Sequence, residues 1–134
     1  MALSFAVNYV AVLVATVAAL IIGFIWFMPN VFGGRWLAYL SRPGEQLRPG
    51  PEFVLSIASA LVNAWTLAIL ALNLKAASAM DGLVIGLLVW VGFFVTVSTA
   101  NTAIAKRPWG LWAIDVGHAL VAQVAMAVIV TLMR

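Results

Sequence analysis

The sequence predicts an all-α integral membrane protein, an antiparallel bundle of four membrane-spanning helices with a short interfacial segment after the first helix. Hydrophobic residues make up 66% of the 134 residues and charged residues only 8%, whereas a soluble domain carries roughly 25% charged residues. The apolar residues also form four stretches, each near the roughly 20 residues that a helix needs to cross a bilayer. We therefore expect one transmembrane domain over residues 1–134, with spans at about 4–28, 53–74, 82–105 and 109–133.

The first span carries small residues at four-residue spacing. Ala11, Ala15, Ala19 and Gly23 form one stripe along a helix, and small residues let two helix backbones approach closely. We expect this stripe to face another helix. The stretch has neither a basic n-region nor a small-residue cleavage site, so it is interpreted as a retained span and not as a signal peptide.

A short aromatic segment follows the first span. Pro29 should end that helix, because proline has no N–H to donate. Trp26, Phe32 and Trp36 suit the headgroup level of a bilayer, and Gly33 lets the chain turn along the surface. These residues predict an interfacial turn or short helix, and a structural role is favoured over ligand binding.

The second span follows a polar loop. Residues 41–52 are rich in proline, glycine and charged side chains, which is typical of a flexible aqueous loop. In the span itself, Asn63 falls near mid-membrane and Ser59 nearer the loop. An amide at that depth forms an interhelical hydrogen bond worth about 1 kcal/mol, so joining helices is favoured over solute contact for Asn63.

The third span begins with a small-residue packing motif, Gly82-Leu-Val-Ile-Gly86, and becomes polar in its later half, which includes Asn101. The motif permits close helix packing but is common by chance in apolar spans. The small-residue stripes on several spans exceed what one tight bundle needs, and we therefore predict a homo-oligomer.

The basic residues predict the orientation. Five fall on one side of the bundle and two on the other, namely Arg35, Arg42, Arg48, Lys106 and Arg107 against Lys75 and Arg134. The positive-inside rule places the larger set in the cytoplasm. We expect a multi-pass protein of a bacterial inner (cytoplasmic) membrane with both termini outside the cytoplasm. The net charge of +3 therefore reflects orientation in the membrane and does not indicate nucleic-acid binding.

The last span contains the ionisable residues Asp115 and His118. At 100° per residue they lie about 60° apart on one helix face. Ionisable groups within a membrane are costly and therefore mark candidate functional sites. From their depths along the spans, the candidate polar site consists of Asp115, His118, Asn101, Asn63, Ser59 and Gln123.

This polar layer is compatible with three functions. A carboxylate and an imidazole one turn apart could bind or pass a small solute, an ion or a proton. The same groups could instead hold helices together in a non-catalytic assembly or scaffold subunit of a membrane oligomer or complex. An enzyme is the least supported, because one histidine and no cysteine are too few for a dedicated metal site or a thiol nucleophile. We expect no enzyme activity and no metal or cofactor.

Several short motifs carry a resemblance to a known family. They are Asn8-Tyr9, the run from Trp26 to Trp36, Gly92-Phe93 and Asp115-Val116-Gly117-His118. With these motifs, nearly the whole chain resembles the prokaryotic domain-of-unknown-function seventeen sixty-one family of small four-span membrane proteins. The resemblance implies a fold and a membrane location but no activity. The position of Phe27 looks more often like tyrosine in that family.

Overall fold

The computed structural model describes residues 2–45 and 50–134. Along the chain its elements are α1 (Tyr9–Trp26), η1 (Pro29–Gly33), α2 (Gly34–Tyr39), α3 (Pro51–Asn73), α4 (Ala79–Val89), η2 (Trp90–Val95), α5 (Thr96–Ala105) and α6 (Trp109–Leu132), where η denotes a π-helical segment. No strand occurs in the described ranges. The predicted all-α fold is confirmed.

Four helical stretches are long and apolar enough to cross a membrane. They are Tyr9–Trp26, Pro51–Asn73, Ala79–Ala105 and Trp109–Leu132. The third stretch joins α4, η2 and α5 into one continuous helix, with a π-helical segment in its middle. These stretches confirm the four-span, multi-pass architecture.

Two spans begin elsewhere than expected, because polar side chains cap their helices. The first was expected from about residue 4 but begins at Tyr9, where the Asn8 side chain accepts hydrogen bonds from the next backbone N–H groups. The third was expected from about residue 82 but begins at Ala79, where Ser78 and Asp81 form a capping box. Residues 2–8 are non-helical.

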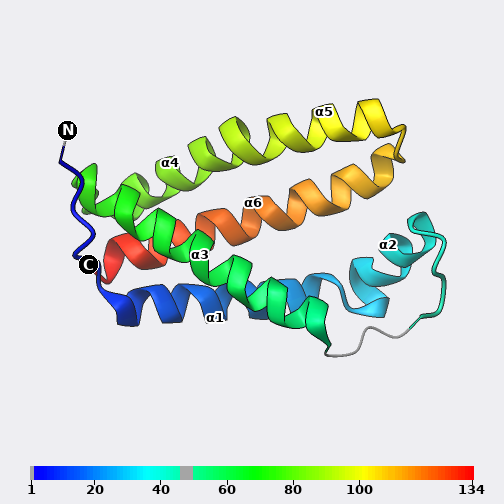
Figure 1. Cartoon of the computed structure of the whole chain (residues 1–134), viewed down its shortest axis with the longest axis horizontal. Coiled ribbons are helices and arrows are strands. Elements are labelled where there is room, and N and C mark those ends of the chain that lie inside the picture. The colour runs from blue at the N-terminus through cyan, green and yellow to red at the C-terminus, as the bar shows by residue number, and fades with distance from the viewer. Residues whose placement is uncertain (1, 46–49) are drawn as a thin grey trace.

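Helix α6 is the central helix of the bundle, and it packs against α1, α3 and α4 (Figure 1). Ten of its residues are buried, three of which are alanines. Those in the main core are Ala122, Met126, Ala127 and Val130. They meet the predicted small stripe of α1, of which Ala11, Ala15 and Ala19 are buried. The expectation that this stripe faces another helix is confirmed.

The predicted glycine motif brings α4 unusually close to α6. A Cβ added to Gly82 would lie 2.8 Å from Val128 Cα, and one added to Gly86 would lie 2.8 Å from Val124 Cα. Such distances leave no room for a side chain, so glycine at these two positions permits direct backbone contact between the helices.

The bundle is closed at one end and splayed at the other. Figure 1 places both termini and the α3–α4 turn at the closed end, and α2 and the α5–α6 turn at the opposite end. Every residue from 51 to 59 of α3 is exposed, whereas Ala64, Leu67, Ala68 and Ala71 in its later half are buried. Helix α3 therefore packs only near the closed end and diverges from α5 towards the other.

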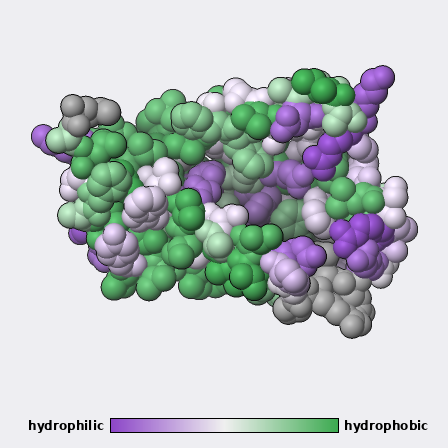
Figure 2. All heavy atoms as spheres, viewed as in Figure 1, coloured by the Kyte–Doolittle hydropathy of each residue, from purple (hydrophilic) through white to green (hydrophobic). Residues whose placement is uncertain are grey.

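The surface matches this shape. Figure 2 shows that the face presented in Figure 1 is largely hydrophobic, with polar residues gathered in a hollow near its middle and at the end that carries α2. That end also holds Arg35, Arg42, Lys106 and Arg107, whereas Arg48 lies outside the described residues. At the closed end Arg134 donates hydrogen bonds to the carbonyl oxygens of Ala71 and Ala76.

Candidate functional site

Asp115 is a half-buried carboxylate in the second turn of α6, and its partner comes from outside the four spans. The indole N–H of Trp36, in α2, donates a hydrogen bond of 3.0 Å to Asp115 Oδ1. The short helix expected after the first span does form, and it packs against α6. The segment predicted as an interfacial turn or short helix therefore supplies part of the candidate site.

Two further tryptophans hold the same turn of α6. Trp26 Nε1 donates to the Ile114 carbonyl oxygen at 3.1 Å, and Trp90 Nε1 donates to the Val116 carbonyl oxygen at 2.9 Å. Together with Trp36, indoles from α1, α2 and η2 thus bind three consecutive residues of α6. Buried indole N–H groups need an acceptor, so these bonds fix both the depth and the rotation of Asp115.

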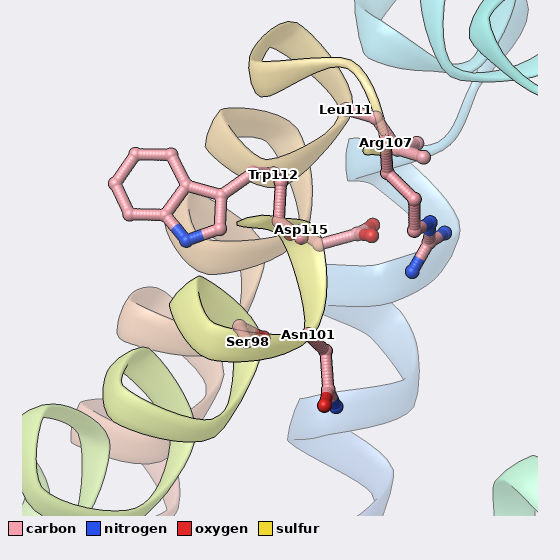
Figure 3. Close-up of a pocket in the computed structure, with 7 residues that line it drawn as sticks. Ser98, Asn101, Arg107, Leu111, Trp112 and Asp115 are labelled. Atoms are coloured by element: carbon pink, nitrogen blue, oxygen red, sulfur yellow. The ribbon is translucent and has the colours of Figure 1, made fainter. Parts of the chain in front are cut away.

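A cavity of about 60 Å³ lies beside Asp115, where the end of α5 meets the start of α6. Its lining is largely polar and consists of Ser98, Asn101, Thr102, Arg107, Leu111, Trp112 and Asp115. Figure 3 shows the side chains of Asp115 and Arg107 extending to the same side of α6, while the ring of Trp112 extends the other way. The Trp112 indole N–H donates to Thr99 Oγ1 at 3.1 Å.

Arg107 reaches this cavity because of the turn before it. Lys106 ends α5 in the left-handed conformation with φ of 54°, and the Arg107 N–H then bonds the Thr102 carbonyl oxygen at 3.1 Å. Within residues 2–45 and 50–134 the only salt bridge joins Arg42 to Glu45 on the surface. Asp115 and Arg107 therefore line one cavity without forming a salt bridge.

The other predicted site residue in this cavity is Asn101, which is exposed at its rim. His118 lies elsewhere, with its ring centroid 5.0 Å from that of Phe27 and 6.3 Å from that of Trp26. Its Nε2 atom is buried and has no hydrogen-bond partner among the described residues. The structure thus brings Asp115 together with Asn101, while His118 packs among aromatic rings.

The remaining predicted residues lie away from the cavity. Gln123 is buried at 7% exposure, and its Oε1 atom has no partner in the described part of the chain. Asn63 is half-buried on α3, and Ser59 is exposed on the diverging half of the same helix. The predicted six-residue layer is therefore dispersed over the bundle, because the first half of α3 leans away from α5, and because His118 and Gln123 lie further along α6 than Asp115.

The predicted interfacial segment, which includes Trp26, Pro29, Phe32, Gly33 and Trp36, forms one packed unit. The Trp26 and Phe32 ring centroids are 4.7 Å apart, and those of Phe27 and Trp36 are 5.1 Å apart. Gly33 is buried, and a Cβ there would strike the Phe27 carbonyl oxygen. Pro29 begins η1, where its missing N–H leaves no donor unsatisfied. Glycine is thus required where the chain folds back towards α6.

Sequence reasoning missed several residues of the site. The predicted site residues do not include Arg107, Trp90, Ser98, Thr102 or Trp112. The spacing of Trp112 and Asp115 by three residues places them on neighbouring positions of one helix, which could have identified Trp112. Among the described residues no group of three or more His, Cys, Asp or Glu could hold a metal ion.

Comparison with known proteins identifies a family. A family model described as "Protein of unknown function (DUF1761)" matches residues 10–131, which is nearly the whole chain. No curated protein and no solved structure matches.

Proposed function

The chain belongs to this DUF1761 family, and from the geometry of its site we propose that the Asp115 cavity binds a small solute, an ion or a proton in the membrane. The family's description names no activity, so the site itself must carry the argument. The proposal assigns no enzymatic reaction and no cofactor to this chain.

The observation that carries the proposal is the partner of Asp115. A carboxylate in a membrane span normally pairs with a cation or serves a functional site. Here it is held by an indole N–H on Oδ1, and its side chain borders a polar cavity. An acceptor that is fixed in position and forms no salt bridge with a cation of the described chain is suited to a cationic or hydrogen-bond-donating ligand.

The cavity limits the size of that ligand. A cavity of about 10–15 Å³ already admits a water molecule, so about 60 Å³ admits a few waters or one small polar group. Drug-sized ligands occupy pockets of about 300–1,000 Å³. We therefore favour a proton, a small cation or a single ammonium group over a bulky solute.

A second candidate is a non-catalytic assembly subunit, and the exposed first half of α3 favours it. Every residue from 51 to 59 is exposed, including the polar residues Ser56 and Ser59. A homo-oligomer in which α3 meets a second copy would cover these groups. Mass measurement in a mild detergent tests this candidate, and a monomer alone would count against it.

We further propose an inner-membrane location with both termini outside the cytoplasm. The support is the positive-inside rule, applied to the cluster of Arg35, Lys106 and Arg107 at the end opposite the termini.

The experiment for the Asp115 site compares wild type with Asp115→Asn, which keeps the side-chain size and an acceptor for Trp36. We expect similar thermal stability in detergent. The variant should lose proton or monovalent-cation flux in liposomes. It should also lose the shift of the Trp36 indole N–H resonance that methylammonium causes in the wild-type protein. Ser59→Ala is the matched control outside the cavity and should behave like wild type. If flux and shift do not differ between wild type and Asp115→Asn, the site proposal is wrong.

A further inference from the structure

We infer that the ligand of the Asp115 cavity is the headgroup of a lipid that carries both a primary ammonium and a phosphate, with the ammonium on Asp115 and the phosphate on Arg107. This inference rests on the proposed function and names the class of ligand that the site takes. Four features of the site support it, namely its charges, its size, its surroundings and its depth.

The charges match a zwitterion. Asp115 and Arg107 border the same cavity with opposite charges and form no salt bridge. Two charges that do not neutralise each other can each pair with one end of a ligand. A guanidinium is well suited to phosphate oxygens, and a carboxylate to ammonium N–H donors.

The size of the cavity admits only the tip of a ligand. About 60 Å³ holds an ammonium group with little beyond it. Arg107 and Asn101 line the cavity and are themselves exposed, so the rest of the ligand can extend outward past them. A headgroup whose remaining atoms stay in the membrane fits this arrangement.

The outer surface beside the cavity is apolar. At 100° per residue, Val97, Asn101 and Ile104 lie within about 60° of one another on α5. Val97 is 57% exposed and Ile104 is 83% exposed. The polar rim residue Asn101 is thus flanked by two side chains that can contact acyl chains, and a ligand that extends from the cavity at Asn101 meets an apolar surface.

The depth of Asp115 suits a headgroup. It lies six residues beyond Trp109, or roughly 9 Å along the helix axis. Trp109 is 53% exposed at the start of the span, as expected of tryptophan at the headgroup level. Each headgroup layer is about 5–7 Å thick, so Asp115 lies a short distance on the hydrocarbon side of that layer, where a headgroup that dips inward can reach it.

This geometry discriminates between headgroups. A primary ammonium donates three hydrogen bonds, whereas a trimethylated ammonium has no N–H and is bulkier. A glycerol headgroup offers no positive charge to Asp115. The site should therefore prefer phosphatidylethanolamine over phosphatidylcholine and phosphatidylglycerol with the same acyl chains.

The test is native mass spectrometry of the full chain in detergent, titrated separately with these three lipids. We expect phosphatidylethanolamine to bind at least tenfold more tightly than either other lipid. Asp115→Asn and Arg107→Gln should each reduce its binding by about tenfold. The control Arg35→Gln removes a cation at the same end of the molecule but outside the cavity, and should change little.

Three outcomes would overturn the inference. Equal binding of the three lipids by the wild-type protein would overturn it even before any variant is measured. Retention of the full preference in Asp115→Asn would remove the assigned role of the carboxylate. Binding of water-soluble phosphoethanolamine as tightly as the lipid would exclude the membrane as the source. If the lipid preference is absent while the methylammonium shift still depends on Asp115, the lipid inference is wrong and the proposed function stands. If the lipid preference and the methylammonium shift are both absent, the inference and the proposed function are both wrong.

Discussion

The hydrogen bond from Trp36 Nε1 to Asp115 Oδ1, 3.0 Å long, joins two residues that are 79 positions apart in the chain. It connects the short helix after the first span to the fourth span. Phe27 packs against the Trp36 ring from the end of α1, and the buried Gly33 lets the chain fold back. The segment after α1 therefore positions the only acidic side chain of α6.

The first prediction concerns this bond. Trp36→Phe keeps an aromatic ring against Phe27 but removes the indole N–H. We expect the free energy of unfolding in detergent to fall by about 1–2 kcal/mol, because a carboxylate oxygen loses its donor within a span. Trp109→Phe is the matched control, because Trp109 is exposed and its ring packs edge-on against that of Trp112. Equal destabilisation by the two variants would show that the Trp36 bond contributes nothing specific.

The fold could be predicted from the sequence because it depends on properties that each segment carries by itself. Length and hydropathy define a span without reference to other segments, and the four spans followed from them. The stripe of Ala11, Ala15 and Ala19 likewise indicated a packed face, and this face is buried. The starts of α1 and α4 were missed although their caps, Asn8 and Ser78, are visible in the sequence.

The site could be predicted only in part, because it depends on distances between segments. Asp115 and Asn101 were grouped by depth, and both line the cavity. Depth alone does not determine helix rotation or tilt, so Ser59 was grouped with them although α3 leans away. The bond between Trp36 and Asp115 depends on a reversal of the chain after α1. The aromatic and glycine residues of that segment predict a turn, but they do not indicate which residue of another helix Trp36 will contact.

The second prediction concerns the contact between α4 and α6. Gly86→Ala places a Cβ 2.8 Å from Val124 Cα, so the helices must separate, and we expect a loss of about 1–3 kcal/mol in unfolding free energy. Gly92→Ala lies in the same span and meets nothing within 4 Å. Thermal unfolding in detergent should therefore show a lower melting temperature for Gly86→Ala alone. An equal decrease for both variants would indicate an effect of helix flexibility, not of packing.

The third prediction concerns orientation. The positive-inside rule places the end with Arg35, Lys106 and Arg107 in the cytoplasm. A reporter that is active only in the cytoplasm should be silent when fused after Arg134, and active when inserted after Gly44, between α2 and α3. The opposite pattern would reverse the proposed orientation, and with it the side of the membrane from which the Asp115 cavity is reached.

The last prediction separates the role of His118 from that of Asp115. The His118 ring packs near Phe27 and Trp26, and its Nε2 atom is buried without a partner in the described chain. A buried polar atom without a partner costs about 1–3 kcal/mol. We therefore expect His118→Phe, which keeps a planar ring, to be as stable as wild type or more stable.

His118→Ala is the matched control, because it removes the ring of a half-buried residue and should lower the unfolding free energy by about 1–2 kcal/mol, less than truncation of a fully buried aromatic residue does. His118 does not line the cavity, so His118→Phe should leave methylammonium binding at Asp115 unchanged. Thermal unfolding and the Trp36 indole resonance measure the two effects separately. The contrary outcome is a stable His118→Phe protein in which Asp115 still binds methylammonium but proton flux is lost. That result would assign the His118 imidazole to a proton path that begins at Asp115.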